Sequence, residues 1–241
     1  KQMLSDAVNN GDGTYTFTCP VSPLRVEEEI HMQLHYTDDI TGVPMTYSVK
    51  RYFDTLLANE SVYDAKTMRL VKLILNYARA LQKYEGYADD CLANRDLSAD
   101  AAENVELSDI YDAVIVNSGS NVRAKSASLD VASLVTMNVN FALSEGIDLS
   151  QYRVTLDGKT VAAKKSGTTC MISLKGISPT GFDDMHVFRI QSLHDPADYS
   201  EITFSVYSYA KKLMQTSSDS TLGALAQAIA NYGEAAIAYQ E

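Results

Sequence analysis

The stretch that decides the fold is residues 204–239, FSVYSYAKKLMQTSSDSTLGALAQAIANYGEAAIAY, because residues 47–84 carry a related pattern, YSVKRYFDTLLANES and then ILNYARALQKY. Three identities lie 157 positions apart: Ser48 and Ser205, Val49 and Val206, and Tyr52 and Tyr209. Self-similarity at a fixed spacing marks a duplicated module. We therefore read the chain as two copies of one unit, an arrangement used more often to bind, space or display than to catalyse.

The correspondence extends over most of both copies. Gly13 corresponds to Gly167, and Ser22-Pro23 corresponds to Ser178-Pro179. Five further identities lie 155 positions apart: Ile74 and Ile229, Asn76 and Asn231, Tyr77 and Tyr232, Ala80 and Ala235, and Tyr84 and Tyr239. The spacing drifts by a few positions, as small loop insertions between equivalent elements would produce.

The second copy predicts a β-sandwich. Its short stretches of alternating or apolar character are residues 113–117, 124–129, 134–141, 151–156, 160–164, 168–174, 185–190 and 202–206. Such alternation is typical of half-buried strands. Asp157-Gly158, between two of these stretches, is a strong hairpin signal. About eight short strands within ~100 residues predict an antiparallel, Ig-like sandwich.

The first copy contains only the later part of this strand series. Residues 3–8, 14–18, 29–36 and 45–49 correspond to the last four strands of the second copy. The equivalents of roughly residues 110–155 would fall before Lys1. Since the chain begins with Lys rather than Met, we expect it to be a fragment of something larger. Two options stay open: the first sheet is cut in mid-domain, or its missing strands are supplied from elsewhere.

Each copy then turns helical. Residues 49–57 and 206–214 carry apolar residues at helical spacing, and longer helices follow at residues 64–84 and 221–239. The loops between them are short, so the two helices of each copy are expected to form an antiparallel hairpin. The predicted fold class is therefore α+β, with tandem Ig-like sandwich units that each precede a two-helix hairpin.

The predicted domains follow from this pattern. Residues 1–86 form a first repeat with an N-terminally incomplete sandwich, residues 87–108 a linker, and residues 109–241 a second repeat. The linker is polar and acidic, with a possible helical turn at residues 87–93. Because it is not rich in Gly, Ser or Pro, we expect it to lie against a domain surface.

Composition excludes several classes of protein. An apolar content of 46% supports packed cores, and the formal charge of −11 argues against nucleic acid as a partner. No run approaches the ~18 apolar residues of a membrane helix, so no membrane insertion is predicted. Three cysteines, Cys19, Cys91 and Cys170, cannot all pair within the chain and are expected to be buried, unreactive thiols.

The pattern also resembles a known kind of module. Residues 231–236 (NYGEAA) are similar to the NYGAAAQ-type helix of large secreted and cell-surface proteins of Gram-positive anaerobic bacteria. Residues 145–159 resemble the hairpin of those proteins, and residues 86–94 resemble the segment that leaves their helix. The first copy departs from the pattern, with Ala78 where a Gly is expected. The resemblance implies an extracellular or cell-surface location and no particular reaction.

No motif in the chain predicts catalysis. There is no nucleophile elbow, no phosphate-binding glycine loop and no CxxC pair. His31 and His35 are four positions apart on a predicted strand, roughly 13 Å at ~3.3 Å per residue, which is too far for one metal ion. Both are expected to face solvent. We predict no catalytic, metal-binding or cofactor-binding residue, no cofactor and no enzymatic activity.

The tyrosines and one glycine are predicted to serve packing. Tyr is abundant at 15 residues and Trp is absent, which weakens carbohydrate binding through flat aromatic faces. The repeated tyrosines at positions 52, 77, 84, 209, 232 and 239 lie on apolar helical stripes, so we expect them to pack. Gly233, inside a helix, is expected to permit a close approach between elements.

These observations predict a non-enzymatic extracellular module for binding or spacing on a bacterial surface or secreted protein. Protein–protein adhesion is the preferred hypothesis, with a host glycoprotein or immunoglobulin as candidate ligands, and it requires an exposed apolar patch. The alternative is a carbohydrate-binding accessory module of a secreted glycan-degrading protein, which requires a groove with two or more exposed tyrosines. Hydrolysis would require a deep pocket with convergent ionisable groups.

Overall fold

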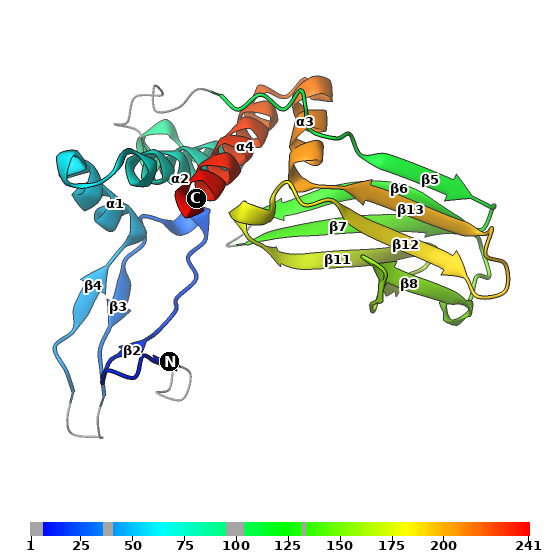
Figure 1. Ribbon diagram of the computed structural model, residues 1–241, viewed down its shortest axis with the longest axis horizontal. Helices are drawn as coiled ribbons and strands as arrows, with labels where there is room; N and C mark the ends of the chain where they lie inside the picture. The colour runs from blue at the N-terminus through cyan, green and yellow to red at the C-terminus, as the bar shows by residue number, and fades with distance from the viewer. Residues whose placement is uncertain (1–6, 36–40, 95–103, 132–133) are drawn as a thin grey trace.

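The computed structural model describes residues 7–35, 41–94, 104–131 and 134–241. The fold is mixed α+β: helices lie at one end of the molecule, two antiparallel sheets lie at the other, and a thin hairpin projects away from both (Figure 1). None of the described helices is both long and apolar enough to cross a membrane.

The helices start where the sequence offers a cap. They are α1 (Val49–Ala58), α2 (Ala65–Tyr84), α3 (Val206–Thr216) and α4 (Ser220–Gln240). Ser48, Asp64, Ser205 and Asp219 precede them, and each side chain accepts a hydrogen bond from a backbone N–H of the first turn. Such caps satisfy donors that have no partner within the helix. All four helices lie within two residues of the predicted ranges.

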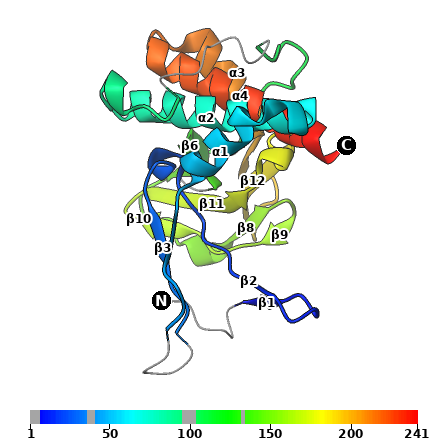
Figure 2. The same ribbon diagram turned by 90° about the vertical axis from the view of Figure 1, so that its left-hand side faces the viewer.

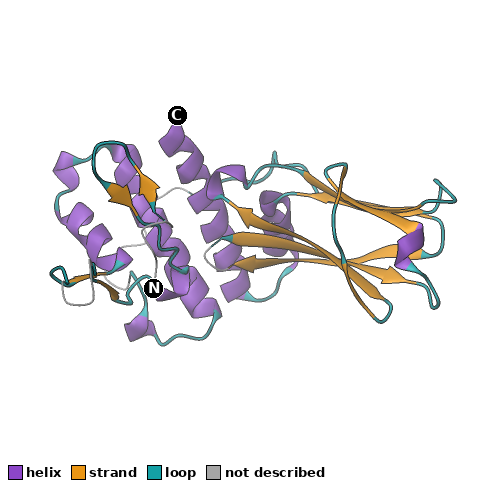
Figure 3. Cartoon of the chain, turned by 90° about the horizontal axis from the view of Figure 1, so that it is seen from below, coloured by secondary structure: helices purple, strands orange, loops and turns teal. Residues whose placement is uncertain are grey.

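Two sheets of the second half share one hydrophobic core. The five-stranded sheet runs β5-β13-β12-β8-β9 and the four-stranded sheet runs β10-β11-β7-β6. The two layers are seen edge-on in Figure 3. Their bounds are β5 Val114–Ser118, β6 Val122–Val131, β7 Val135–Leu143, β8 Tyr152–Leu156, β9 Lys159–Thr160, β10 Lys164–Ser166, β11 Thr169–Ile177, β12 His186–Ser192 and β13 Tyr199–Phe204.

Alternating side chains of these strands form that core. In β7, alternate residues from Val135 to Leu143 are buried, and Phe188, Ile190 and Phe204 of the opposing sheet join the same cluster. The hairpin predicted at Asp157-Gly158 is present: both residues have positive φ, 50° and 76°, and connect β8 to β9. Positive φ at both central positions is what a type I′ two-residue hairpin turn requires.

One predicted strand is wrong. Residues 160–164 were expected to form a single strand, whereas β9 ends at Thr160 in the five-stranded sheet and β10 begins at Lys164 in the four-stranded one. The intervening residues 161–163 carry the chain from one layer to the other. The other strands differ from their predicted bounds by one to three residues, and Val206, predicted to end the last strand, belongs to α3.

The strands of the first half form two separate hairpins. β1 (Val8–Asn9) pairs with β2 (Tyr15–Thr16), and β3 (Ile30–Met32) pairs with β4 (Met45–Tyr47). β2, β3 and β4 are shorter than predicted, and β1 ends one residue later than predicted. Residues 3–6 and 36 of the predicted strands lie outside the described residues. Both hairpins extend away from the helices (Figure 2).

The helices join the two halves. One face of α2 (Met68, Val71, Leu75) forms a small core with Leu56 of α1. Another face of α2, with Tyr77 and Leu81, belongs to the core of the second half, together with α3 and α4. The helical layer is thus continuous from α1 to α4.

The segment predicted as a linker is packed at both of its described ends. A 3-10 turn at Asp89–Cys91 lies within the predicted helical turn, and Leu92 and Ala93 after it are buried. Leu107, on the far side of residues 95–103, is also buried. The prediction that this segment lies against a surface is therefore met where the segment is described.

Candidate binding surface

The first half exposes large apolar side chains. We call the β3–β4 hairpin the arm, and its side chains Met32, Leu34, Met45 and Tyr47 the arm surface. These four side chains are 44%, 57%, 64% and 37% exposed. Val8, Tyr15, Phe17 and Val43, elsewhere in the same part of the chain, are exposed as well. Clustered exposed apolar residues mark interaction surfaces more often than isolated ones do.

The arm has a counterpart in the second half with the same strand register. Ile30 lies opposite Tyr47 and Met32 opposite Met45, as His186 lies opposite Phe204 and Phe188 opposite Ile202. The repeat spacing relates the arm surface to four core residues in order: Phe188, Ile190, Ile202 and Phe204. All four counterparts are at most 4% exposed. The arm thus has apolar side chains at the positions that are buried in β12 and β13, but the described residues place no second layer over them.

The base of the arm is anchored to the helices. The backbone N–H of Lys50 donates to the carbonyl of Val26 at 2.8 Å, and Val26 is buried. Tyr207 N–H donates to the carbonyl of buried Phe182 at 3.0 Å, which is the corresponding hydrogen bond of the second half. Each acceptor follows a short 3-10 turn, Pro23–Arg25 or Pro179–Gly181, that starts after a serine.

Counterparts from the two halves meet at the junction. The rings of Tyr77 and Tyr232 stack with centroids 5.4 Å apart. A small apolar cavity of about 130 Å³ lies beside them, and its lining includes Val21 and Ile177, Pro23 and Pro179, Val26 and Phe182, and Tyr77 and Tyr232. The repeat spacing relates the two members of each pair.

Gly233 permits a close approach here, as predicted. A Cβ at this position would lie 2.6 Å from the Tyr207 hydroxyl oxygen and 2.7 Å from the Phe182 ring. Both distances are too short for a side chain, so α4 can contact this part of α3 only with glycine. The alanine at the corresponding position of α2, Ala78, is buried in the smaller core.

Burial controls the ionisation of the junction tyrosines. It raises the pKa of Tyr77 well above the usual value, with a smaller contribution from Tyr232. Burial also raises the pKa of Tyr207, assisted by the negative charges of Asp183 and Glu234. Both side chains are buried in the core of the second half, so the neutral form of each phenol is favoured there.

Other repeated tyrosines differ from the prediction. Tyr52, Tyr84 and Tyr239 are 46%, 45% and 51% exposed, although all were expected to pack. They lie near helix ends or on helix faces that the described residues leave open. Tyr209 is half-buried against the core, in line with the prediction.

Polar side chains hold the segment between the halves. The backbone N–H of Val105 donates to Asn231 at 2.9 Å, and the N–H of Ala93 donates to buried Gln82 at 2.8 Å. Asn94 donates to Asn76, the counterpart of Asn231. The repetition of the Asn-Tyr pair was visible in the sequence, but nothing there identified its hydrogen-bond role or that of Gln82.

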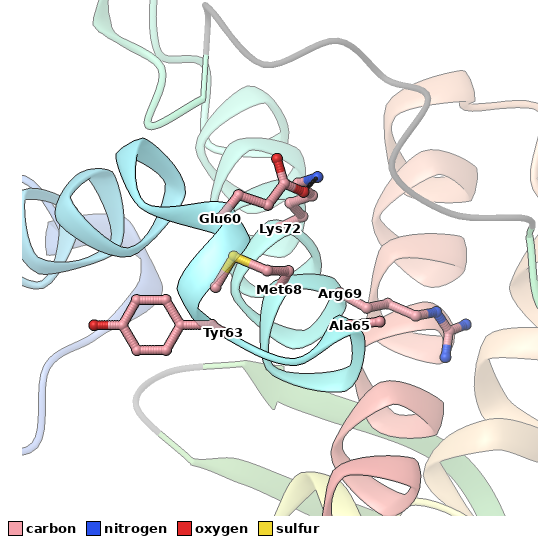
Figure 4. Close-up of a pocket in the computed structure, with 6 residues that line it drawn as sticks. All are labelled: Glu60, Tyr63, Ala65, Met68, Arg69 and Lys72. Atoms are coloured by element: carbon pink, nitrogen blue, oxygen red, sulfur yellow. Dashed lines mark hydrogen bonds and ion pairs between the residues drawn. The ribbon is translucent and has the colours of Figure 1, made fainter.

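An open pocket of about 360 Å³ lies beside the start of α2 (Figure 4). Its charged groups are paired: Lys72 with Glu60 at 2.6 Å, and Arg69 with Glu234 of α4 at 2.5 Å. Tyr63 is the one tyrosine that lines it. The pocket therefore has one tyrosine where the glycan hypothesis requires two or more.

The exposure of two histidines and the burial of one cysteine agree with the predictions, whereas the exposure of the other two cysteines does not. His31 and His35 are exposed, as predicted. Cys170 is buried, and burial raises the pKa of its thiol, but Cys19 and Cys91 are exposed where burial was predicted. Cys19 follows the short strand β2, over which the described chain places no second layer. Within the described part of the chain, no three His, Cys, Asp or Glu side chains are grouped so as to hold a metal ion.

No protein-family model, no curated protein and no solved structure matches this chain. The resemblance to surface-protein modules therefore stays a prediction.

Proposed function

We propose that this chain is a non-catalytic repeat module of an extracellular or cell-surface bacterial protein, and that it works through protein–protein contact at the arm surface. One observation carries the proposal: the arm keeps apolar side chains exposed at positions whose counterparts form the core of the second half. Burying a side chain of this size contributes roughly 1.5–3 kcal/mol, so a partner gains affinity by covering the arm surface.

The proposal includes the finer architecture: tandem units, each an Ig-like sandwich followed by a helical hairpin, with the first sandwich incomplete. The matching strand registers of β3–β4 and β12–β13 support it. The matching hydrogen bonds to Val26 and Phe182 support it as well. The resemblance of residues 231–236 to surface-protein modules supports the location.

A binding assay tests the role of the arm surface. The immobilised chain is exposed to host serum and, in parallel, to a glycan array. We expect it to retain a serum protein, and we expect Met32→Asp with Met45→Asp to abolish retention, because two buried charges oppose contact.

The matched control is Ile115→Asp, on an exposed position of β5 that is 56% exposed and far from the arm. It should retain the same protein. Glycan binding without protein binding would favour the carbohydrate alternative, and retention that survives the arm substitutions would contradict the proposal.

A further inference from the structure

The strands of the first half have unpaired edges. β1–β2 and β3–β4 are each two-stranded sheets, so every one of these strands has one edge without a sheet partner among the described residues. Isolated two-stranded hairpins are marginally stable in water, and unpaired edges are templates for further strands. The arm combines such edges with an uncovered apolar face.

The second half shows which strands occupy the corresponding edges. β8 pairs with the outer edge of β12, and β5 pairs with the outer edge of β13. In the other sheet, β7 pairs with β11, the counterpart of β2. The strands that complete the second half are thus β5 to β9, residues 114–160, a continuous piece of chain.

The same piece supplies the second layer. Met137, Val139 and Phe141 of β7 are fully buried in one cluster with Phe188 and Phe204. The first half has counterparts of β10 to β13 but, among its described residues, none of β5 to β9. The second half therefore already contains an interface between strands β5–β9 and a hairpin with the register of the arm.

We infer that the unpaired edges of β2, β3 and β4 bind a segment of five antiparallel strands built like residues 114–160, supplied by a neighbouring repeat in which this segment is not already paired with hairpins of its own. This inference rests on the proposed function and names the partner of the arm surface. The donated strands pair with these edges, and their apolar side chains cover Met32, Leu34, Met45 and Tyr47.

A second copy of this chain does not fit as the donor. Its own residues 114–160 are committed: the side chains of Val139 and Phe141 are 0% exposed in its own core. Donating them would expose that core. A repeat whose β5–β9 segment is not paired with hairpins of its own can donate these strands without exposing a core.

A fusion protein tests the inference. Residues 109–163 are added ahead of Lys1 of the full chain, and backbone hydrogen exchange is followed at Tyr15–Thr16, Ile30–Met32 and Met45–Tyr47. We expect exchange at these amides to slow by about 100-fold or more relative to the unfused chain, because they become part of a closed sheet and core. Exchange within α2 and α4 should not change.

The matched control carries Met137→Asp and Phe141→Asp in the added segment only, which places charges on its apolar face. This fusion should leave the arm amides unprotected. Unchanged exchange in the first fusion would overturn the inference. Protection that appears in the unfused chain as its concentration rises would also overturn it, in favour of a second copy.

The two proposals fail separately. Arm-dependent retention of a serum protein, together with an unprotected arm in the fusion, would leave the proposed function standing without this partner. Slowed exchange at the arm amides of the fusion, together with no retention of serum protein, would leave the inference standing. The function of the arm surface would then be contact between repeats.

Discussion

The β3–β4 and β12–β13 hairpins have the same register and opposite surroundings. In the second half, Phe188 and Ile202 lie beneath a second sheet, whereas Met32 and Met45 at the corresponding positions of the arm are exposed. Pairing two strands therefore does not create a core; a covering layer does. The difference between the two hairpins can be measured with matched substitutions in each of them.

The largest difference is expected between Phe188→Ala and Met32→Ala. Phe188 is fully buried, so its truncation leaves a cavity and should lower the free energy of unfolding by roughly 3–5 kcal/mol. Met32 is 44% exposed, and its truncation should cost less than about 1 kcal/mol. Urea unfolding of both variants measures the two values. Equal losses would show that the arm is covered in solution.

Replacing each of two glycines in α4 by alanine should change the stability of the protein in opposite directions. Gly233→Ala forces a methyl group against Tyr207 and Phe182, and we expect it to destabilise by ~1–3 kcal/mol despite the better helix propensity of alanine. Gly223→Ala is the control, because nothing lies within 4 Å of its Cβ position. It should stabilise by up to ~1 kcal/mol. Thermal unfolding compares them, and stabilisation by both would refute the close contact at the junction.

Substitutions of a buried junction tyrosine and of an exposed tyrosine on β2 should affect stability differently at alkaline pH. Burial, and to a lesser degree Tyr232, raises the pKa of Tyr77, so the folded state holds this proton more tightly than the unfolded state. The resulting stability is complete below the unfolded pKa of about 10 and is lost as pH rises toward the folded pKa. We expect the wild-type protein to lose up to ~1.4 kcal/mol per pH unit above 10 from this group.

Tyr77→Phe should remove that part of the alkaline loss, since phenylalanine does not titrate. Tyr15→Phe is the matched control on β2, where the side chain is 45% exposed. Denaturant unfolding at pH 9 to 11 provides the measurement, and identical curves for both variants would argue against a buried Tyr77.

The smallest effect is expected at the ion pair between the halves. Arg69 and Glu234 join α2 to α4, and both side chains are about a third or more exposed. Arg69→Ala should therefore cost ~0.2–1 kcal/mol at low salt and less at high salt. Lys50→Ala removes the Lys50–Asp54 pair within α1 and serves as control. Coupling between Arg69 and Glu234 that persists at 1 M salt would mean that the pair is less solvated than its exposure indicates.

Local features of this fold could be predicted from the sequence. The helix starts at Ser48, Asp64, Ser205 and Asp219 follow from caps that depend on a few neighbouring residues. The hairpin at Asp157-Gly158 is local for the same reason. The two 3-10 turns at Pro23–Arg25 and Pro179–Gly181 each begin at the proline of a Ser-Pro pair, which is also visible in the sequence.

Tertiary features could not be predicted. Alternation in residues 29–36 shows which side chains share a face, but not whether another layer covers that face, so the exposure of Met32 and Leu34 was missed. The same limit explains the exposed Cys19. The stacking of Tyr77 on Tyr232 depends on how α2 and α4 lie against each other, which no periodicity within one helix contains.

The Tyr77–Tyr232 contact has a consequence for assembly. A contact in which a residue meets its own counterpart is isologous, and it is saturated once two partners are engaged. Heterologous contacts, by comparison, leave a free end to which another unit can be added. In the repeat architecture proposed above, the α2–α4 interface is complete with two units. A longer array of such units would have to assemble through a different surface.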